Sequence, residues 1–270
     1  MNTLEKIIAD KYVEVEARKQ QRPVAELEKS SAFSRAALSL KSFILDPAKS
    51  GIITEFKRKS PSKGLINGTS SVEVVCKGYE QAGASALSVL TDQDFFGGST
   101  SDLELARKQV TIPILRKDFV VDEYQILEAK SMGADCILLI AAALTPEKVQ
   151  SLAAFAQNLG LEVLLEVHNL EELEQSFCDG LDVVGVNNRN LKNFEVSLET
   201  SLALVDRIPN QVVKISESGI SDPATLVAFR KAGFHGFLIG ENFMKTSSPE
   251  QAAMDFIQEF RRLMGGPTIG

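Results

Sequence analysis

The sequence contains few of the residues that build metal sites and disulfide frameworks. It has three cysteines, Cys76, Cys136 and Cys178, with no C-x-x-C spacing, and only two histidines, His168 and His235. An odd, scattered set of cysteines predicts free thiols in a reducing cytoplasm instead of disulfides. Two histidines without a cysteine pair cannot supply a zinc site at the usual spacing, so we expect no metal ion.

The chain also lacks an excess of basic residues and any long hydrophobic run. Its 29 lysines and arginines are outnumbered by 36 aspartates and glutamates, which gives a net charge of −7. This balance argues against nucleic acid and membranes as partners, but it leaves room for a small anion in a local basic pocket. The longest apolar run, Cys136–Leu144, has nine residues, about half of a membrane span. The first residues do not read as a secretory signal, so we expect a cytoplasmic protein.

Short β-branched runs alternate with helical segments along most of the chain. Eight such runs start 21 to 34 residues apart, which is close to the length of one strand–helix unit. Most are apolar throughout, as parallel strands buried on both faces should be. The expected strands are Ile52–Lys57, Ala86–Thr91, Ile112–Lys117, Cys136–Ile140, Glu162–Val167, Val183–Asn187, Val212–Ser216 and Gly236–Ile239.

Capping residues mark the helices between these strands. The expected helix starts are Thr145-Pro146, Asn169 with Glu172, Asp222-Pro223 and Ser248-Pro249, and the expected ends are Gly160, Gly180, Gly233 and about Met264. Eight strand–helix units in 270 residues predict the α/β class and one (β/α)₈ TIM barrel, residues 1–270, because such a barrel needs about 250 residues. An open doubly wound sheet is the alternative, disfavoured because no G-x-G-x-x-G follows the first strand.

Residues 1–49 precede the first strand and form an N-terminal helical extension. One amphipathic helix is expected around Leu4, Ile7, Ile8 and Tyr12, with a weaker helical patch over Phe33–Leu40. The extension could plug the bottom of the barrel or cover the region near its active mouth. The sequence leaves both alternatives open.

Polar or charged groups, or glycine, follow six of the eight expected strands. In this barrel catalytic groups lie at the C-terminal ends of strands, where side chains point into one mouth. Glu55 and Lys57 share the inward face of the first strand, where a carboxylate and an ammonium are costly unless paired or used. The other such strand ends carry Lys117, Glu166, Asn187, Glu217-Ser218 and Gly240-Glu241. The fourth strand has no charge, and Leu138 and Ile140 are expected to form an apolar wall.

The last two strand ends suit a phosphate group. Ser218-Gly219 and Gly240-Glu241 follow strands seven and eight, where barrel enzymes often bind phosphate through backbone N–H groups. Glycine lets an anion approach the backbone closely. Ser60, in the loop after the first strand, offers a hydroxyl to the same site. The Glu241 carboxylate would repel a phosphate, so we expect it to point away.

Several motifs, in the same order along the chain, closely resemble the indole-3-glycerol-phosphate synthase family. They are ITEFKRKSPS (53–62), LTD (90–92) with FGGS (96–99), LRKDF (115–119), LEVH (165–168), GVNNRNL (185–191), SESG (216–219) and LIGE (238–241). The resemblance covers essentially the whole chain. It implies a carbon–carbon carboxy-lyase of tryptophan biosynthesis that converts 1-(2-carboxyphenylamino)-1-deoxyribulose 5-phosphate into indole-3-glycerol phosphate. The reaction closes a pyrrole ring, releases carbon dioxide and water, and uses no cofactor in this family.

The resemblance also assigns expected roles to side chains at the mouth. It implies that Lys117 is the acid that protonates the oxyanion formed in ring closure, a task suited to an ammonium in a dry site. Glu55, Lys57 and Glu166 remain for the later proton transfers, and the sequence leaves their individual roles open. The expected catalytic residues are Glu55, Lys57, Lys117, Glu166, Asn187 and Ser218. The expected substrate-binding residues are Ser60, Phe96, Phe119, Leu138, Arg189, Glu217, Gly219, Gly240 and Glu241, of which Phe96, Phe119 and Leu138 would sandwich the anthranilate ring.

Two polar residues beside these side chains are expected to have structural roles. His168 is expected to pack or cap near Glu166, and Asp118 to be an ion-pair partner within the mouth. We expect a monomer that acts on a small phosphorylated molecule and carries one activity, with association with other enzymes of tryptophan synthesis left open.

Two other functions compete with this prediction. One is another phosphate-binding barrel such as phosphoribosylanthranilate isomerase, which works through a Cys/Asp acid–base pair. No cysteine stands at the mouth end of the first strand, which argues against it. The other is a non-catalytic barrel that only binds a phosphorylated ligand, and it should have lost one or more of the mouth charges.

Overall fold

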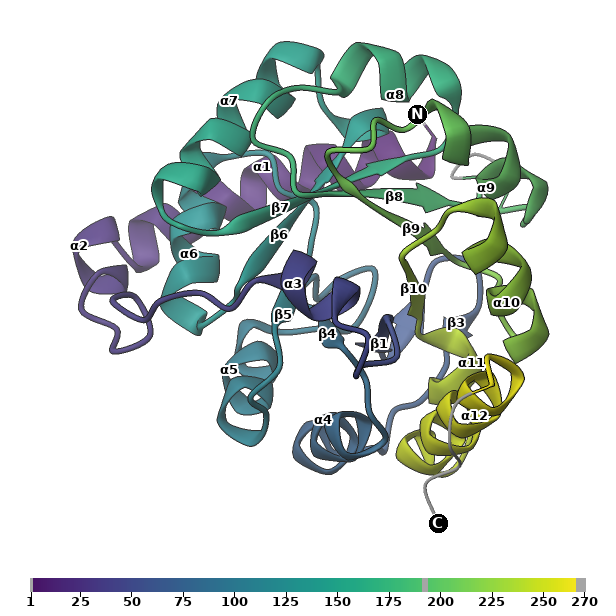
Figure 1. The fold of residues 1–270 in the computed structure, drawn as a ribbon. Coiled ribbons are helices and arrows are strands. Elements are labelled where there is room, and N and C mark those ends of the chain that lie inside the picture. The colour runs from purple at the N-terminus through teal and green to yellow at the C-terminus, as the bar shows by residue number, and fades with distance from the viewer. Residues whose placement is uncertain (1, 191–193, 266–270) are drawn as a thin grey trace.

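A closed barrel of eight parallel strands forms the centre of the molecule, and helices surround it (Figure 1). The computed structural model describes residues 2–190 and 194–265. The strands are β1 Ile52–Phe56, β4 Ala86–Leu90, β5 Ile114–Lys117, β6 Cys136–Ile140, β7 Glu162–Val167, β8 Val183–Asn187, β9 Val213–Glu217 and β10 Gly236–Ile239. They pair in the order β1-β10-β9-β8-β7-β6-β5-β4, with β4 closing on β1. The predicted (β/α)₈ barrel is therefore confirmed, and every expected run overlaps one of its strands.

The connecting helices begin largely where the capping residues predict. They are α4 Val72–Gln81, α5 Thr100–Gln109, α6 Glu123–Met132, α7 Pro146–Asn158, α8 Leu170–Ser176, α9 Glu199–Leu204, α10 Pro223–Ala232, α11 Glu241–Met244 and α12 Pro249–Leu263, with 3₁₀ turns η1 Ala141–Ala143 and η2 Val205–Arg207. Thr145, Asn169 and Asp222 each accept a backbone N–H at a helix start. Helix α8 ends at Ser176, before the predicted Gly180, because Phe177 is extended and packs against the core.

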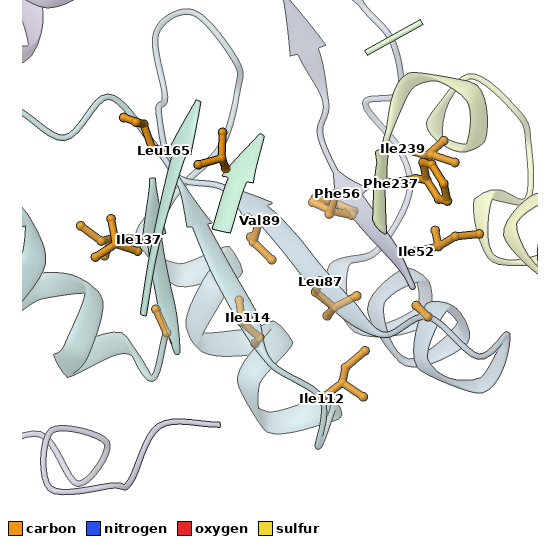
Figure 2. Packing of buried hydrophobic residues seen from close by; sticks show 14 of the residues in the cluster. Ile52, Phe56, Leu87, Val89, Ile112, Ile114, Ile137, Leu165, Phe237 and Ile239 are labelled. Carbon is orange, nitrogen blue, oxygen red and sulfur yellow. The ribbon is translucent and has the colours of Figure 1, made fainter. Parts of the chain in front are cut away.

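Alternation along the strands divides the buried residues into two layers. Ile52 and Phe56 of β1 face outward and pack between the barrel and its helices (Figure 2). Ile53, between them, faces inward and packs inside the barrel with residues such as Leu115 and Leu164. Successive side chains of a strand point to opposite faces, so both faces of each strand are buried and the barrel is a packed core.

The first segment of the N-terminal extension folds as a long helix at the barrel mouth. Helix α1 (Thr3–Gln21) starts at Asn2, which forms a reciprocal cap with Glu5. Its inward face comprises Ile7, Lys11 and Val15. Tyr12 is 48% exposed, so the predicted apolar face was wrong at that position. The reason is that a lysine, held by ion pairs, occupies the buried position one residue earlier.

The end of the extension fills the opposite end of the barrel. The predicted helical patch over Phe33–Leu40 was wrong, because Ser39 caps a helix that only begins at residue 40. Helices α2 (Val24–Leu27) and α3 (Leu40–Leu45) complete the extension. Leu40 and Ile44 pack against the inward residues at the start of the strands. The two alternatives for the extension are thus both correct, each for a different segment.

A small hairpin follows β1 and lies at the mouth. Strands β2 (Lys59–Ser60) and β3 (Gly64–Leu65) pair in antiparallel fashion. Both Lys59 and Arg58 also hydrogen-bond to the segment after β4. The loop after the first strand is therefore a hydrogen-bonded hairpin that brings Ser60 and Ser62 to the mouth.

Candidate active site

A pocket of about 370 Å³ opens at the C-terminal ends of the strands, within the range of small-molecule sites. The residues predicted for catalysis and binding all line it, from β1 and the hairpin around the barrel to the segment after β10. Leu138 and Ile140 of β6 supply the predicted apolar part of the wall. The fold thus brings together side chains that are up to 186 residues apart in the sequence, from Glu55 to Glu241.

Lys117 lies at the centre of the charged groups in the pocket. Its Nζ is 2.6 Å from Glu166 Oε2 and 3.3 Å from Glu217 Oε2. Burial alone would lower the pKa of Lys117, but the negative charges of Glu166, Glu217 and Glu55 outweigh burial and raise it well above its usual range. The side chain is therefore a charged ammonium that faces the pocket and holds protons to donate.

Glu166 is held as a carboxylate by neighbours on three sides. The Asn187 amide donates to Oε1 at 3.0 Å, and His168 Nε2 lies 3.4 Å from the same atom. Burial would raise the pKa of Glu166, but the charge of Lys117 and the contact with His168 hold it well below its usual range. Asn187 also accepts the Arg189 backbone N–H at 2.9 Å, so it orients both Glu166 and the following loop.

Glu217 differs from Glu166 in that its pKa is raised instead of lowered. It is buried, and no hydrogen bond to its Oε1 is present within the described residues. Burial raises its pKa to about 7, with repulsion from Glu166 and Glu55 adding to the effect and attraction to Lys117 opposing it. Gly185 makes room for this carboxyl, because a Cβ at that position would lie 2.0 Å from Oε1. Glu217 can therefore exchange a proton near neutral pH.

Glu55 and Lys57 form an ion pair on the inward face of β1, as their spacing predicts. The Lys57 Nζ lies 2.7 Å from Glu55 Oε1, and the Ser88 hydroxyl donates to Oε2 at 3.1 Å. The backbone of Gly240 packs on this carboxylate, since a Cβ there would lie 2.6 Å from Glu55 Oε1. The ion pair is thus fixed beside the segment that was predicted to bind phosphate.

Arg189 connects the loop after β8 to two other segments of the mouth. Its guanidinium donates to Ser62 Oγ at 2.8 Å and to Glu241 Oε2 at 3.0 Å. Glu241 therefore lines the pocket as part of an ion pair with Arg189, and the Lys63 Nζ lies 3.8 Å from its Oε1. Its negative charge is neutralised by these cations instead of being isolated in the pocket.

The turn after β9 has an unusual backbone. Ser218 adopts a φ of 69° and Gly219 a φ of 76°. The left-handed region is costly for a residue with a side chain, and such strain concentrates at functional sites. The Asn188 amide donates to the Ser218 carbonyl at 3.1 Å, which holds the turn in this conformation beside the pocket.

An aromatic pair forms one wall of the pocket. The rings of Phe96 and Phe119 have centroids 5.9 Å apart and are tilted by 40°, which is a direct aromatic contact. An additional ring does not fit between two rings at this separation. A flat aromatic group would therefore lie against the pair, with Leu138 lining the same pocket.

Some pocket residues were not predicted as part of the site. Helix α1 contributes Thr3, Leu4 and Ile7, and the apolar spacing of Leu4 and Ile7 marks a buried face without indicating what it covers. Phe194 and Lys245 also line the pocket, but they belong to no strand end and carry no signal that would single them out.

His168 and Asp118 can now be compared with their structural interpretations. His168 caps through its backbone N–H and ring, both of which contact Glu172, but its ring also approaches Glu166. Burial would lower its pKa, yet the two glutamates raise it to about 9. Asp118 forms the predicted ion pairs, at 3.0 Å to both Lys11 and Arg116. The capping interpretation of His168 therefore covers only part of what this residue contacts.

Metal-ligand clusters and membrane spans were also sought in the structure. Within residues 2–190 and 194–265, no group of three or more histidine, cysteine or acidic side chains could hold a metal ion. None of the helices in those same ranges is both long enough and apolar enough to cross a bilayer.

Comparisons with known proteins show the family to which the chain belongs. The family model described as "Indole-3-glycerol phosphate synthase" matches residues 4–256. A relative from Bacteroides thetaiotaomicron, named "Indole-3-glycerol phosphate synthase", is 49% identical over 255 residues, which cover 94% of this chain and 97% of the relative. A solved structure described as "Native KDPGal structure" shares the fold with a TM-score of 0.55 and 14% identity, over 79% of this chain and 94% of that one. The chain belongs to the indole-3-glycerol phosphate synthase family.

Proposed function

We propose that the pocket binds 1-(2-carboxyphenylamino)-1-deoxyribulose 5-phosphate and converts it into indole-3-glycerol phosphate, carbon dioxide and water. The observation that carries the proposal is the charged Lys117 ammonium, which faces the pocket between Glu166 and Glu217. A buried ammonium with carboxylates at hydrogen-bond distance can donate a proton and take one back without leaving the site. Membership in the family supports the substrate and the carboxy-lyase chemistry.

Ring closure is the step that we assign to Lys117. The aromatic carbon that bears the carboxylate attacks the ketone carbon of the sugar, and the electron pair of the C=O bond moves to oxygen. Lys117 donates its proton to that oxygen, which stabilises the charge as it develops. Loss of carbon dioxide from the same ring carbon then restores the aromatic ring.

Dehydration needs one group that removes a proton and another that protonates the departing hydroxide. Glu55, Lys57 and Glu166 line the pocket near the reacting region and are the groups we propose for these transfers. Glu217 joins them, because a carboxyl with a pKa of about 7 can carry a proton in either direction near neutral pH. We leave the division of roles among these four side chains open.

The remaining pocket residues are proposed to hold the substrate. Backbone N–H groups of Gly219 and Gly240 would receive the phosphate, since phosphate sites of such barrels form after the last two strands. Ser60 would close that site from the hairpin. Asn187, Ser218 and Arg189 would hold hydroxyl and carboxylate groups, and the anthranilate ring would lie against Phe96, Phe119 and Leu138.

The direct test is the reaction itself with purified protein. We expect indole fluorescence to develop from the carboxyphenylamino substrate in buffer that contains a chelator and no nucleotide. Conversion of phosphoribosylanthranilate into the carboxyphenylamino compound, with no indole formed, would instead favour an isomerase. No cysteine lines the described pocket, however. Binding of the substrate without any turnover would favour a non-catalytic phospholigand protein.

We further propose that the chain acts as a monomer in the cytoplasm. All three cysteines, Cys76, Cys136 and Cys178, are free thiols in the structure, which supports a reducing compartment. Light scattering of the purified protein is expected to give the mass of one chain, 29.4 kDa. Association with other enzymes of tryptophan synthesis can be sought in the same experiment by adding them one at a time.

A further inference from the structure

A buried lysine of helix α1 interacts with the segments after two barrel strands. The Lys11 side chain is 1% exposed, and its Nζ lies 2.6 Å from Glu14, 2.8 Å from Asp92 and 3.0 Å from Asp118. Burial alone would lower the pKa of Lys11, but the surrounding carboxylates raise it well above its usual range. An ammonium that is removed from water needs such partners, so its position is tightly determined.

Each of the two barrel carboxylates also holds the backbone of a loop. Asp92 follows β4, and its Oδ1 accepts the backbone N–H groups of Phe95 at 2.9 Å and Phe96 at 3.1 Å. Asp118 follows β5, and its Oδ1 accepts the backbone N–H of Phe119 at 2.8 Å. Lys11 thus contacts both carboxylates that fix the backbone at the two aromatic residues of the pocket.

Strands β4 and β5 are neighbours in the barrel, with Leu90 paired to Lys117. The two loops that follow them carry the rings of Phe96 and Phe119, which contact each other at 5.9 Å. Two contacts therefore connect the loops. One is the contact between the two rings within the pocket, and the other is formed by Lys11, which pairs with both aspartates.

The same face of α1 reaches the pocket. Ile7 lies one helical turn before Lys11, so both side chains project from one side of the helix. Ile7, together with Leu4, lines the pocket directly. The ion pairs of Lys11 consequently set the position of α1 relative to the aromatic wall.

We propose that Lys11 is a positioning residue for the aromatic end of the substrate. Through Asp92 and Asp118 its ammonium fixes the phenylalanine pair, and through α1 it fixes the apolar side chains of the helix that line the pocket. The phosphate end is proposed to be held by the segments after β9 and β10, whereas the ion pairs of Lys11 within the described residues are with Glu14, Asp92 and Asp118. This inference rests on the proposed function, because it assumes a ligand with an aromatic and a phosphate end.

The test compares two ligands that share a phosphate and differ in the ring. Dissociation constants of indole-3-glycerol phosphate and glycerol 3-phosphate are measured by calorimetry for wild type and Lys11→Met, with Lys6→Met as the control at an exposed lysine of the same helix. We expect Lys11→Met to weaken the indole ligand at least tenfold and glycerol 3-phosphate less than twofold. Lys6→Met should leave both constants unchanged.

Two further variants keep the test decisive where Lys11→Met folds poorly. Asp92→Asn preserves a side-chain oxygen for the Phe95 and Phe96 N–H groups while removing one charge partner of Lys11, and it should weaken the indole ligand severalfold. Lys11→Arg keeps the cation and should restore most of the selectivity for the indole ligand. A residue that only stabilises the fold would not change the ratio of the two affinities among folded molecules.

The outcomes separate this inference from the proposed function. Equal weakening of both ligands, or an unchanged affinity for indole-3-glycerol phosphate in both Lys11→Met and Asp92→Asn, would overturn the role of Lys11. Failure of the wild-type protein to bind indole-3-glycerol phosphate would instead overturn the proposed function.

Discussion

Two clusters of buried charged residues meet at strand β5, which contributes one residue to each. They differ in the hydrogen bonds of their carboxylates. The mouth cluster consists of Glu55, Lys57, Lys117, Glu166 and Glu217, which all line the pocket. The anchor cluster consists of Lys11, Asp92, Arg116, Asp118 and Glu128, which are all buried. Each cluster has two cations and three carboxylates, and adjacent residues of one strand, Lys117 and Arg116, belong to different clusters.

In the anchor cluster both oxygens of the Asp118 carboxylate accept hydrogen bonds, and the Lys11 ammonium is held by ion pairs. Asp118 accepts from Thr91 at 2.6 Å and from the Phe119 backbone in addition to its two ion pairs. Burial would raise its pKa, but Lys11 and Arg116 hold it well below the usual range. In the mouth cluster Glu217 has one unpartnered oxygen among the described residues and a pKa of about 7. The comparison teaches that residue types do not separate structural from reactive charges, whereas the partners of the carboxylate oxygens do: both oxygens of Asp118 are hydrogen-bonded and one oxygen of Glu217 is not.

The largest expected difference between the clusters is in turnover after loss of one carboxylate charge. Glu166→Gln should lower kcat about 10²- to 10⁴-fold, the usual size of an acid–base contribution. Glu128→Gln, in the anchor cluster, should keep kcat within about threefold per folded molecule, because the ion pairs of Glu128 within the described residues are with Arg18 and Arg116 and its contribution is to stability. Steady-state kinetics of both variants checks this. Similar losses of kcat in the two would erase the distinction.

Loss of a cation from the anchor cluster should appear in stability. The Arg116 side chain is fully buried and donates to Thr91, Asp118 and Glu128. Arg116→Ala leaves two buried carboxylates without this partner, which should lower the free energy of unfolding by about 3–5 kcal/mol. Urea unfolding measures it. A loss below about 1 kcal/mol would mean that the anchor cluster contributes little.

The raised pKa of Glu217 predicts a contribution to the free energy of unfolding that decreases as the pH rises. The unfolded chain ionises this carboxyl near its ordinary value of 4.5, whereas the fold retains the proton up to about pH 7. Its favourable contribution is therefore complete below pH 4.5 and lost as the pH rises through 7. Since one pKa unit corresponds to about 1.4 kcal/mol, the free energy of unfolding of Glu217→Gln relative to wild type should rise by about 2.5 kcal/mol between pH 5 and pH 8. A stability difference that is constant over this range, measured by urea unfolding, would contradict the assignment.

A smaller effect is expected at the phosphate end of the pocket. Replacing Gly240 by valine should raise KM more than tenfold, since a lost charge-assisted hydrogen bond corresponds to about 1.5–3 kcal/mol. The new Cβ would also press on Glu55 Oε1, 2.6 Å away, so some loss of kcat should accompany it. Steady-state KM is the measurement, with KM within about twofold of wild type placing the phosphate elsewhere.

The mouth cluster was more predictable from the sequence than the anchor cluster. Glu55 and Lys57 are two residues apart on one short strand, so alternation alone places both side chains inward. Lys117 and Glu166 likewise follow apolar runs directly. These predictions need only strand periodicity and the rule that active sites lie at the strand ends.

The role of Lys11 could not be read in the same way. A lysine on a helix is ordinarily taken as solvent-exposed, and its partners Asp92 and Asp118 are more than eighty residues away in the sequence. The helix pattern therefore favoured Tyr12, which the fold leaves exposed. The helical patch over Phe33–Leu40 failed for a related reason, since the start of α3 is fixed by Ser39 and by the distant Glu162, which accepts from the Lys41 backbone.

The most direct test of the account is kcat of Lys117→Ala, with folding checked by circular dichroism and substrate binding measured separately. Lys117 faces the pocket and is held by Glu166 and Glu217, so its loss should reduce kcat by about 10²- to 10⁴-fold or more. Substrate binding should survive, because the proposed phosphate and carboxylate contacts come from other strands. A folded Lys117→Ala enzyme with near-normal kcat would contradict the account and would move the ring-closure acid to Lys57.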